Sequence, residues 1–208
     1  MSGEAPLIRL VDPEKHLDRR RLAILRIQTG ILRSMVRRLL DKGYYWILPV
    51  ILSKTTDPLW PDPDFTIEKT IEADIYGEKV VAMQSMIIHK RVLVSLGPEK
   101  FFIISPNIRI ERKSRATTGR HLYEFTQLEI EVAYAKMEDI FKVFEELIVE
   151  AMRYVKDELA SELEFLGRDL KVPSTPFKVY RRRELEEKYG RNWPMEVAKE
   201  IQEPIWVT

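Results

Sequence analysis

Two strand-like segments joined by a short basic loop constrain the fold of this 208-residue chain more than any other feature. Residues Lys100–Arg112 and His121–Tyr134 each alternate polar and apolar side chains. Successive side chains of a strand point to opposite faces of a sheet. The period of two therefore predicts two neighbouring strands, each with one apolar and one polar face, and Ile108 and Ile110 belong to the apolar face of the first.

The polar faces of these two segments are predicted to line one floor. Its residues are Asn107, Arg109, Glu111, Tyr123, Phe125, Gln127, Glu129 and Glu131. A guanidinium binds phosphate, carboxylates and amides bind amines, and an aromatic ring stacks on a nucleobase. The loop adds Lys113, Arg115 and Arg120, which could close over a triphosphate. This inventory favours nucleotide binding, although two amphipathic strands with one solvated face would show the same alternation.

Helical periodicity surrounds these strands. Apolar residues recur at spacings of three and four over Pro13–Lys42, Gln84–Leu96 and Met137–Phe165, which predicts three helices. The first carries many arginines on its other face, which could meet a phosphate backbone or simply solvate the helix. A short charged helix is predicted over Arg181–Tyr189, and Pro204–Thr208 resembles the opening of a strand without a visible partner.

Further strand signals complete the predicted fold. Tyr44–Leu52 reads as a strand interrupted by Pro49, and Ala73–Met83 as a hairpin with Gly77 near its turn. Strands and helices do not alternate regularly, which is typical of the α+β class. We therefore predict an antiparallel sheet flanked by helices, with residues 1–208 forming a single core.

Composition excludes several kinds of chemistry. The 34 Lys and Arg against 33 Asp and Glu leave a net charge of +1, so any site for a polyanion must be local. The absence of Cys excludes disulfides, Cys-ligated zinc and thiol catalysis, and the three scattered His predict no metal site. The longest apolar run, Ile47–Leu52, is far below the ~18 residues that span a bilayer. We expect no membrane contact and residence in the cytoplasm.

Three motifs resemble one family. The run Ile104–Glu131, with Arg109-Ile-Glu111 followed by Gly119-Arg-His-Leu-Tyr-Glu-Phe-Thr-Gln-Leu-Glu129, resembles motif 2 of class II aminoacyl-tRNA synthetases of the aspartate/asparagine/lysine subgroup. The long helix leading to Pro49 resembles motif 1, which builds the dimer interface there. Gln84-Ser-Met-Ile-Ile-His-Lys90 resembles the amino-acid-binding segment. The resemblance runs from about Arg21 to Trp206.

Within this subgroup, the loop Thr56–Pro63 and the absence of an N-terminal anticodon-binding barrel resemble the archaeal asparagine synthetases related to asparaginyl-tRNA synthetase. The resemblance implies that Arg109 grips the α-phosphate of ATP and stabilises the charge that develops during attack. It implies nucleotide contacts from Glu111, Arg120, His121 and Phe125, the last stacking on adenine. It implies amino-acid contacts from Ser85, Lys90 and Gln127, with Lys90 on the side-chain carboxylate of aspartate. Ile87 stands where the synthetases often have a polar residue.

The resemblance also implies a function and partners. The expected reaction is ATP-dependent activation of aspartate to aspartyl-adenylate, followed by transfer to ammonia, giving asparagine, or less readily to tRNA. The motif 1 resemblance implies a homodimer. The Mg²⁺ ligands and motif 3 of the family are expected beyond Thr208, so we also expect a completing C-terminal half, supplied by a separate chain. A non-catalytic dimeric paralogue that binds nucleotide, RNA or a synthetase is the alternative, and a fragment of a longer enzyme is a third reading.

Overall fold

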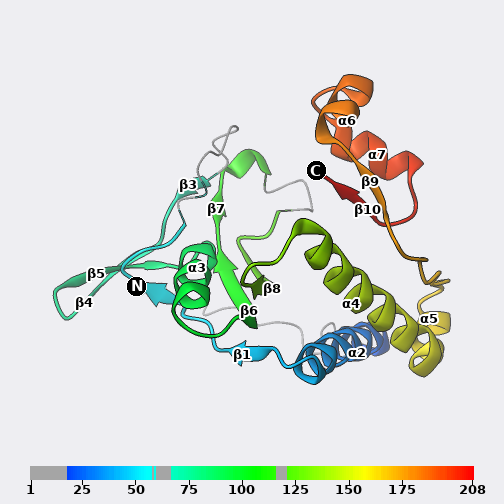
Figure 1. Cartoon of the computed structure of the whole chain (residues 1–208), viewed down its shortest axis with the longest axis horizontal. Helices are drawn as coiled ribbons and strands as arrows, with labels where there is room; N and C mark the ends of the chain where they lie inside the picture. The colour runs from blue at the N-terminus through cyan, green and yellow to red at the C-terminus, as the bar shows by residue number, and fades with distance from the viewer. Residues whose placement is uncertain (1–17, 58, 60–66, 116–120) are drawn as a thin grey trace, which may run out of the picture. The chain divides into compact units, whose positions relative to one another are not determined.

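The computed structural model describes residues 18–57, 59, 67–115 and 121–208 and has the predicted α+β class (Figure 1). The chain divides into two compact units, Met1–Arg38 with Lys136–Thr208, and Leu39–Ala135. That residues 1–208 form one catalytic core stays a prediction. Within the described ranges, no helix is both long and apolar enough to span a membrane.

The main sheet of the unit Leu39–Ala135 has the strand order β1-β6-β8. Strand β6 (Lys100–Ile108) is antiparallel to β8 (Glu124–Val132) along its whole length, so the two central strands form as predicted. Strand β1 (Tyr45–Ile47) pairs with β6 in parallel, which the sequence did not indicate. In the sequence, other short strands and α3 lie between β1 and β6 and form the connection that a parallel pair requires.

Helix α3 (Ile87–Leu96) contributes to the core of this unit. Met83, Met86, Phe101 and Ile103 form a buried cluster, and Leu93 of α3 packs against it. The helix begins later than the predicted Gln84, because the Gln84 carbonyl accepts a hydrogen bond from Arg109 Nε at 3.1 Å. Gln84 is thereby held at the floor and precedes the helix.

Shorter strands complete the unit Leu39–Ala135. Strands β2 (Leu52–Ser53), β5 (Glu78–Ala82) and β4 (Glu72–Ile75) form an antiparallel sheet, and β3 (Ile67–Lys69) pairs with β7 (Ile110–Glu111). A short 3-10 helix covers Lys113–Arg115. The predicted hairpin is confirmed, with Gly77 at φ +79° in its turn. Pro49 lies between β1 and β2, since it has no amide hydrogen for a strand ladder.

The other unit is mainly helical. Helices α2 (Arg19–Asp41), α4 (Met137–Glu158) and α5 (Ala160–Phe165) provide most of it, and α2 continues into the neighbouring unit. The predicted single helix Met137–Phe165 is therefore wrong, because Leu159 at φ −126° interrupts it. Leu147, Ala151 and Val155 form the buried stripe of α4.

The C-terminal region adds β9 (Lys178–Tyr180), α6 (Arg182–Tyr189), α7 (Trp193–Glu200) and β10 (Ile205–Val207). Strand β10 pairs with β9 in parallel, so the prediction that the last segment lacks a partner is wrong. The indole of Trp206 stacks on Phe141 with ring centres 4.1 Å apart. Its Nε1 donates to Glu145 at 2.8 Å, which fixes β10 on α4.

Candidate functional site

The register of β6 and β8 brings the predicted polar residues to one face. Asn107 lies opposite Phe125, Ser105 opposite Gln127, Ile103 opposite Glu129 and Phe101 opposite Glu131. Directly opposite residues share a face of the sheet. The predicted floor is thus present, although β6 changes along it from apolar Phe101 and Ile103 to polar Ser105 and Asn107.

Arg109 lies between β6 and β7 and is held from two sides. Its backbone N–H donates to the Tyr123 carbonyl at 2.8 Å, and its Nε donates to the Gln84 carbonyl. The guanidinium carbon is 4.9 Å from the centre of the Phe125 ring, within range of a cation–π interaction. The predicted phosphate ligand and the predicted adenine platform are therefore in contact.

Other predicted nucleotide contacts lie close together. His121 Nε2 is 3.9 Å from Glu111 Oε2, and both side chains are half-buried. Arg120 lies outside the described residues.

Within the predicted amino-acid segment, the buried Ser85 accepts a hydrogen bond through Oγ from the Ile87 N–H at 3.3 Å. This bond satisfies one of the amide groups at the start of α3.

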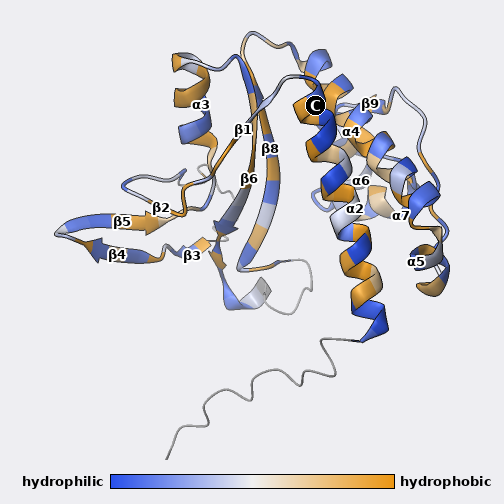
Figure 2. Ribbon diagram, turned by 90° about the horizontal axis from the view of Figure 1, so that it is seen from below, coloured by the Kyte–Doolittle hydropathy of each residue, from blue (hydrophilic) through white to orange (hydrophobic). Residues whose placement is uncertain are grey.

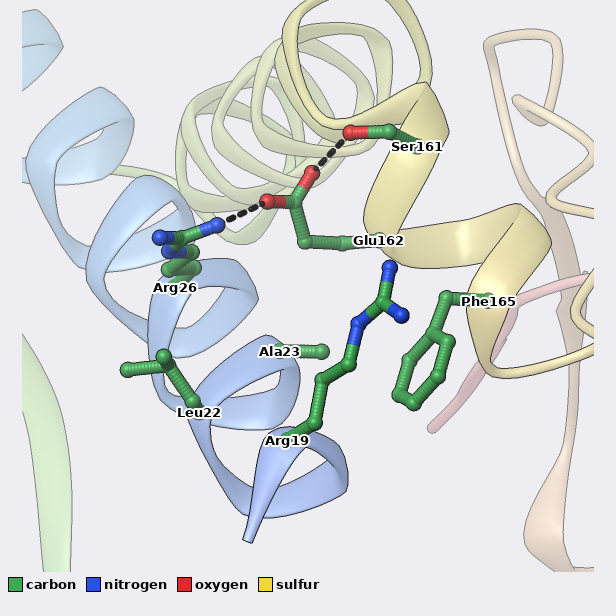
Figure 3. Close-up of a pocket in the computed structure, with 7 residues that line it drawn as sticks. All are labelled: Arg19, Leu22, Ala23, Arg26, Ser161, Glu162 and Phe165. Atoms are coloured by element: carbon green, nitrogen blue, oxygen red, sulfur yellow. Dashed lines mark hydrogen bonds and ion pairs between the residues drawn. The ribbon is translucent and has the colours of Figure 1, made fainter. Parts of the chain in front are cut away.

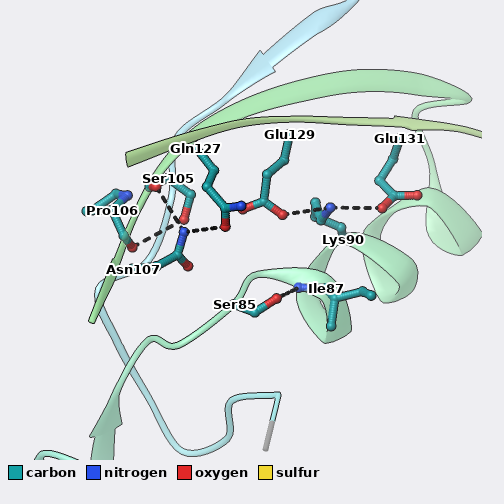
Figure 4. A network of polar contacts seen from close by, with 9 residues as sticks. All are labelled: Ser85, Ile87, Lys90, Ser105, Pro106, Asn107, Gln127, Glu129 and Glu131. Carbon is teal, nitrogen blue, oxygen red and sulfur yellow. Dashed lines mark hydrogen bonds and ion pairs between the residues drawn. The ribbon is translucent and has the colours of Figure 1, made fainter. Parts of the chain in front are cut away.

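Lys90 is buried on α3 and points at the floor (Figure 4). Its Nζ is 2.8 Å from Glu129 and 3.0 Å from Glu131. One ammonium between two carboxylates leaves this part of the floor with a net negative charge when all three are ionised. The sequence placed the two glutamates on the floor but did not indicate that they hold Lys90, because helical and strand periodicities do not define which helix covers which face.

A pair of amides adjoins this cluster. Asn107 Nδ2 donates to the Ser105 carbonyl at 3.2 Å and to Gln127 Oε1 at 3.0 Å (Figure 4). Asn107 Oδ1 and Glu129 Oε1 are both buried and have no hydrogen-bond partner in the described part of the chain. Such groups need an external donor to recover the hydrogen bonds that they lose on burial.

A pocket of about 110 Å³ lies elsewhere, between α2 and α5 (Figure 3). Arg26 donates to Glu162 at 3.0 Å and Ser161 Oγ donates to it at 2.7 Å. These two bonds, with that from Ser161 the larger effect, lower the pKa of Glu162 below its ordinary value. The carboxylate is thus satisfied by protein groups, and the floor remains the candidate site.

The fold matches solved structures of one class. Asparaginyl-tRNA synthetase from Pyrococcus horikoshii, complexed with asparaginyl-adenylate, superposes with a TM-score of 0.76 at 24% identity, over 95% of this chain and 48% of that one. The Entamoeba histolytica asparaginyl-tRNA synthetase gives 0.70 at 20% identity, over 99% of this chain and 51% of that one. The architecture is therefore that of a class II synthetase.

The sequence defines the family. Residues 14–208 match the model of tRNA synthetases class II (D, K and N), and the chain belongs to this family. The aspartate–tRNA(Asp/Asn) ligase of Methanothermobacter thermautotrophicus is 30% identical over 160 residues, 75% of this chain and 33% of the relative. That of Methanopyrus kandleri is 29% identical over 204 residues, 89% of this chain and 44% of the relative. The chain thus spans less than half the length of these relatives.

Proposed function

We propose that this chain activates aspartate with ATP, forming aspartyl-adenylate for asparagine synthesis. The observation that carries the proposal is the common floor of β6 and β8. It joins a guanidinium and an aromatic ring, Arg109 and Phe125, to the buried charge cluster at Lys90. A nucleotide and an amino acid can therefore bind side by side within the unit Leu39–Ala135.

Arg109 and Phe125 provide the nucleotide half of the proposed site. The guanidinium binds the α-phosphate, the ring stacks on adenine, and Glu111 and His121 flank the bound nucleotide. Because Arg109 Nε is already fixed on a backbone carbonyl, the guanidinium is oriented before ATP arrives. A preorganised donor of this kind typically contributes about 10²–10³-fold to kcat.

Lys90 and its two glutamates provide the amino-acid half. The net negative cluster attracts the substrate ammonium, and the buried Oε1 of Glu129 accepts from it. The Glu131 side chain is 24% exposed against 12% for Glu129, so Lys90 exchanges Glu131 for a substrate carboxylate. Asparagine forms only when the side-chain carboxylate is activated. In that reaction Lys90 holds the α-carboxylate, which reverses the assignment that the resemblance implies.

The proposed chemistry has two steps. A carboxylate oxygen of aspartate attacks the α-phosphorus of ATP, the bond to the bridging oxygen breaks, and pyrophosphate leaves. Ammonia then attacks the acyl carbon of the side-chain adenylate and AMP leaves. Aspartyl-tRNA would form instead only from an adenylate of the α-carboxylate, by attack of a tRNA hydroxyl on its acyl carbon. Among the described residues, no group of three or more His, Cys, Asp or Glu side chains could hold a metal ion.

Two features of assembly belong to the same proposal. We propose that turnover also needs the family's motif 3, from further sequence or a separate chain. We also propose a homodimer formed through α2, on which apolar and basic residues alternate, and through the segment around Pro49 (Figure 2). In that segment Tyr45, Leu48 and Ile51 are 65%, 78% and 55% exposed.

Aspartate-dependent exchange of pyrophosphate into ATP tests the reaction directly. With motif 3 supplied, we expect exchange that Arg109→Ala abolishes and that Arg183→Ala, on the exposed surface of α6, leaves unchanged. Exchange that survives Arg109→Ala would contradict the assigned role. Binding of ATP without exchange, also when motif 3 is supplied, would support the non-catalytic paralogue instead.

A further inference from the structure

A backbone carbonyl determines which way the buried side-chain amide of Asn107 is turned. The Ser105 carbonyl oxygen lies 3.2 Å from Asn107 Nδ2. A carbonyl oxygen accepts hydrogen bonds and never donates, so Asn107 must turn its NH₂ group toward it. The reversed amide would bring Oδ1 against the Ser105 carbonyl oxygen. Asn107 has no solvent exposure, so bulk water cannot replace the hydrogen bond that the reversed amide would lose.

The orientation of the Asn107 amide also determines the orientation of the Gln127 amide. The same NH₂ group of Asn107 is 3.0 Å from Gln127, so Gln127 must present Oε1 to it. The Nε2 of Gln127, with its two N–H groups, is then the end of the amide turned away from Asn107. Gln127 is exposed on β8, whereas Asn107 is buried beneath it, so the donor end of Gln127 is the one available to a ligand (Figure 4).

We infer that Asn107 is a positioning residue that fixes the Gln127 amide and makes Gln127 select a hydrogen-bond acceptor on the ligand. The inference rests on the proposed function. The group at Gln127 is then a carbonyl or carboxylate oxygen of the activated amino acid. The ammonium lies toward Glu129, whose buried Oε1 has no hydrogen-bond partner among the described residues. Two residues of β8 thus distinguish the two ends of the amino acid: Gln127 donates to an oxygen and Glu129 accepts from the ammonium.

Calorimetric titration of the full chain with two probes tests this inference. The probes are ATP and a non-hydrolysable aspartyl-adenylate analogue. Asn107→Asp replaces the NH₂ group by an acceptor, which turns the Gln127 amide around. We expect the analogue to bind roughly tenfold more weakly or worse, the loss typical of a hydrogen bond to a charged group. ATP, held by Arg109 and Phe125, should keep its affinity within about twofold.

Three further variants exclude a merely structural effect. Thr126→Ala changes the neighbour of Gln127 on β8, which is exposed on the opposite face of the sheet, and should leave both affinities unchanged. Gln127→Glu presents an oxygen in place of the NH₂ group and should also weaken the analogue. Asn107→Leu removes the donor without adding a charge and serves if Asn107→Asp does not fold. The Gln127 side-chain amide resonance should shift with analogue in Thr126→Ala but not in Asn107→Asp.

The outcomes separate the inference from the proposed function. Equal analogue affinity in the parent, Asn107→Asp and Asn107→Leu would overturn the inference while the proposed function stands. Tighter binding by Gln127→Glu would show that the ligand presents a donor there, and would overturn it as well. A parent chain that binds neither probe would overturn the proposed function itself.

Discussion

Removing the Lys90 ammonium from between Glu129 and Glu131 should destabilise the unit Leu39–Ala135 strongly. In Lys90→Met the alkyl stem is kept, but Glu129 and Glu131 lose the cation that lies 2.8 and 3.0 Å away. The Lys90 side chain is only 8% exposed, so water cannot replace it fully. Breaking a buried ion pair by removing one partner costs about 3–5 kcal/mol. At roughly 2–4 °C per kcal/mol for a chain of this size, Tm should fall by roughly 6–20 °C.

The matched control is Lys54→Met. Its ammonium is 2.9 Å from Glu78, but the two side chains are 69% and 61% exposed. An exposed pair contributes about 0–1 kcal/mol, so this variant should be nearly neutral. Urea unfolding combined with hydrogen exchange of the β8 amides reports on this unit separately from the helical one. Adding Glu131→Gln to Lys90→Met should recover part of the loss. A Lys90→Met variant no less stable than Lys54→Met would contradict the stabilising role of the Lys90 ammonium.

Three further predictions concern packing, pH and assembly. A Cβ on Gly30 would come within 2.7 Å of Leu159 Cδ1 and 2.9 Å of Tyr154 Cε1. Overpacking of about 1–3 kcal/mol then exceeds the roughly 1 kcal/mol of helix propensity that alanine adds, so Gly30→Ala should lower the urea midpoint; a raised midpoint would contradict this. The lowered pKa of Glu162 means that its ionised form stabilises the fold. That stabilisation is present above the ordinary carboxyl pKa and is lost as pH falls from that value through the lowered pKa, so Glu162→Gln should flatten the acid side of the Tm–pH curve; an unchanged slope would count against it. Leu48→Asp should shift sedimentation from dimer to monomer, and a monomeric parent would remove the basis for the proposed dimer.

The period-two alternation of side chains correctly predicted the features that depend on residues close in sequence. The alternation at Asn107–Glu111 and at Phe125–Glu131 predicted a shared polar floor, and the register of β6 and β8 places these faces together as far as Asn107. The burial of Lys90 between two glutamates was not predicted, because it depends on the face of the sheet that α3 covers. The roles of the site residues in binding stay predictions.

The errors have the same physical origin. Strand β10 finds its partner 27 residues upstream in register, Ile205 on Lys178, and no local pattern encodes such a parallel pairing. The break at Leu159 is a local change of backbone conformation, and residues 150–166 contain no Gly or Pro that would predict it. Asn107 was placed on the polar face, but its hydrogen bond to Gln127 is diagonal across two strands and needed the exact register.

The central claim is that the floor of β6 and β8 binds an aminoacyl-adenylate. Calorimetric titration of the 208-residue chain with the non-hydrolysable aspartyl-adenylate analogue tests it most directly. We expect saturable binding that Arg109→Ala removes while thermal unfolding of the variant stays cooperative. No binding at millimolar analogue, or equal binding by Arg109→Ala, would contradict it.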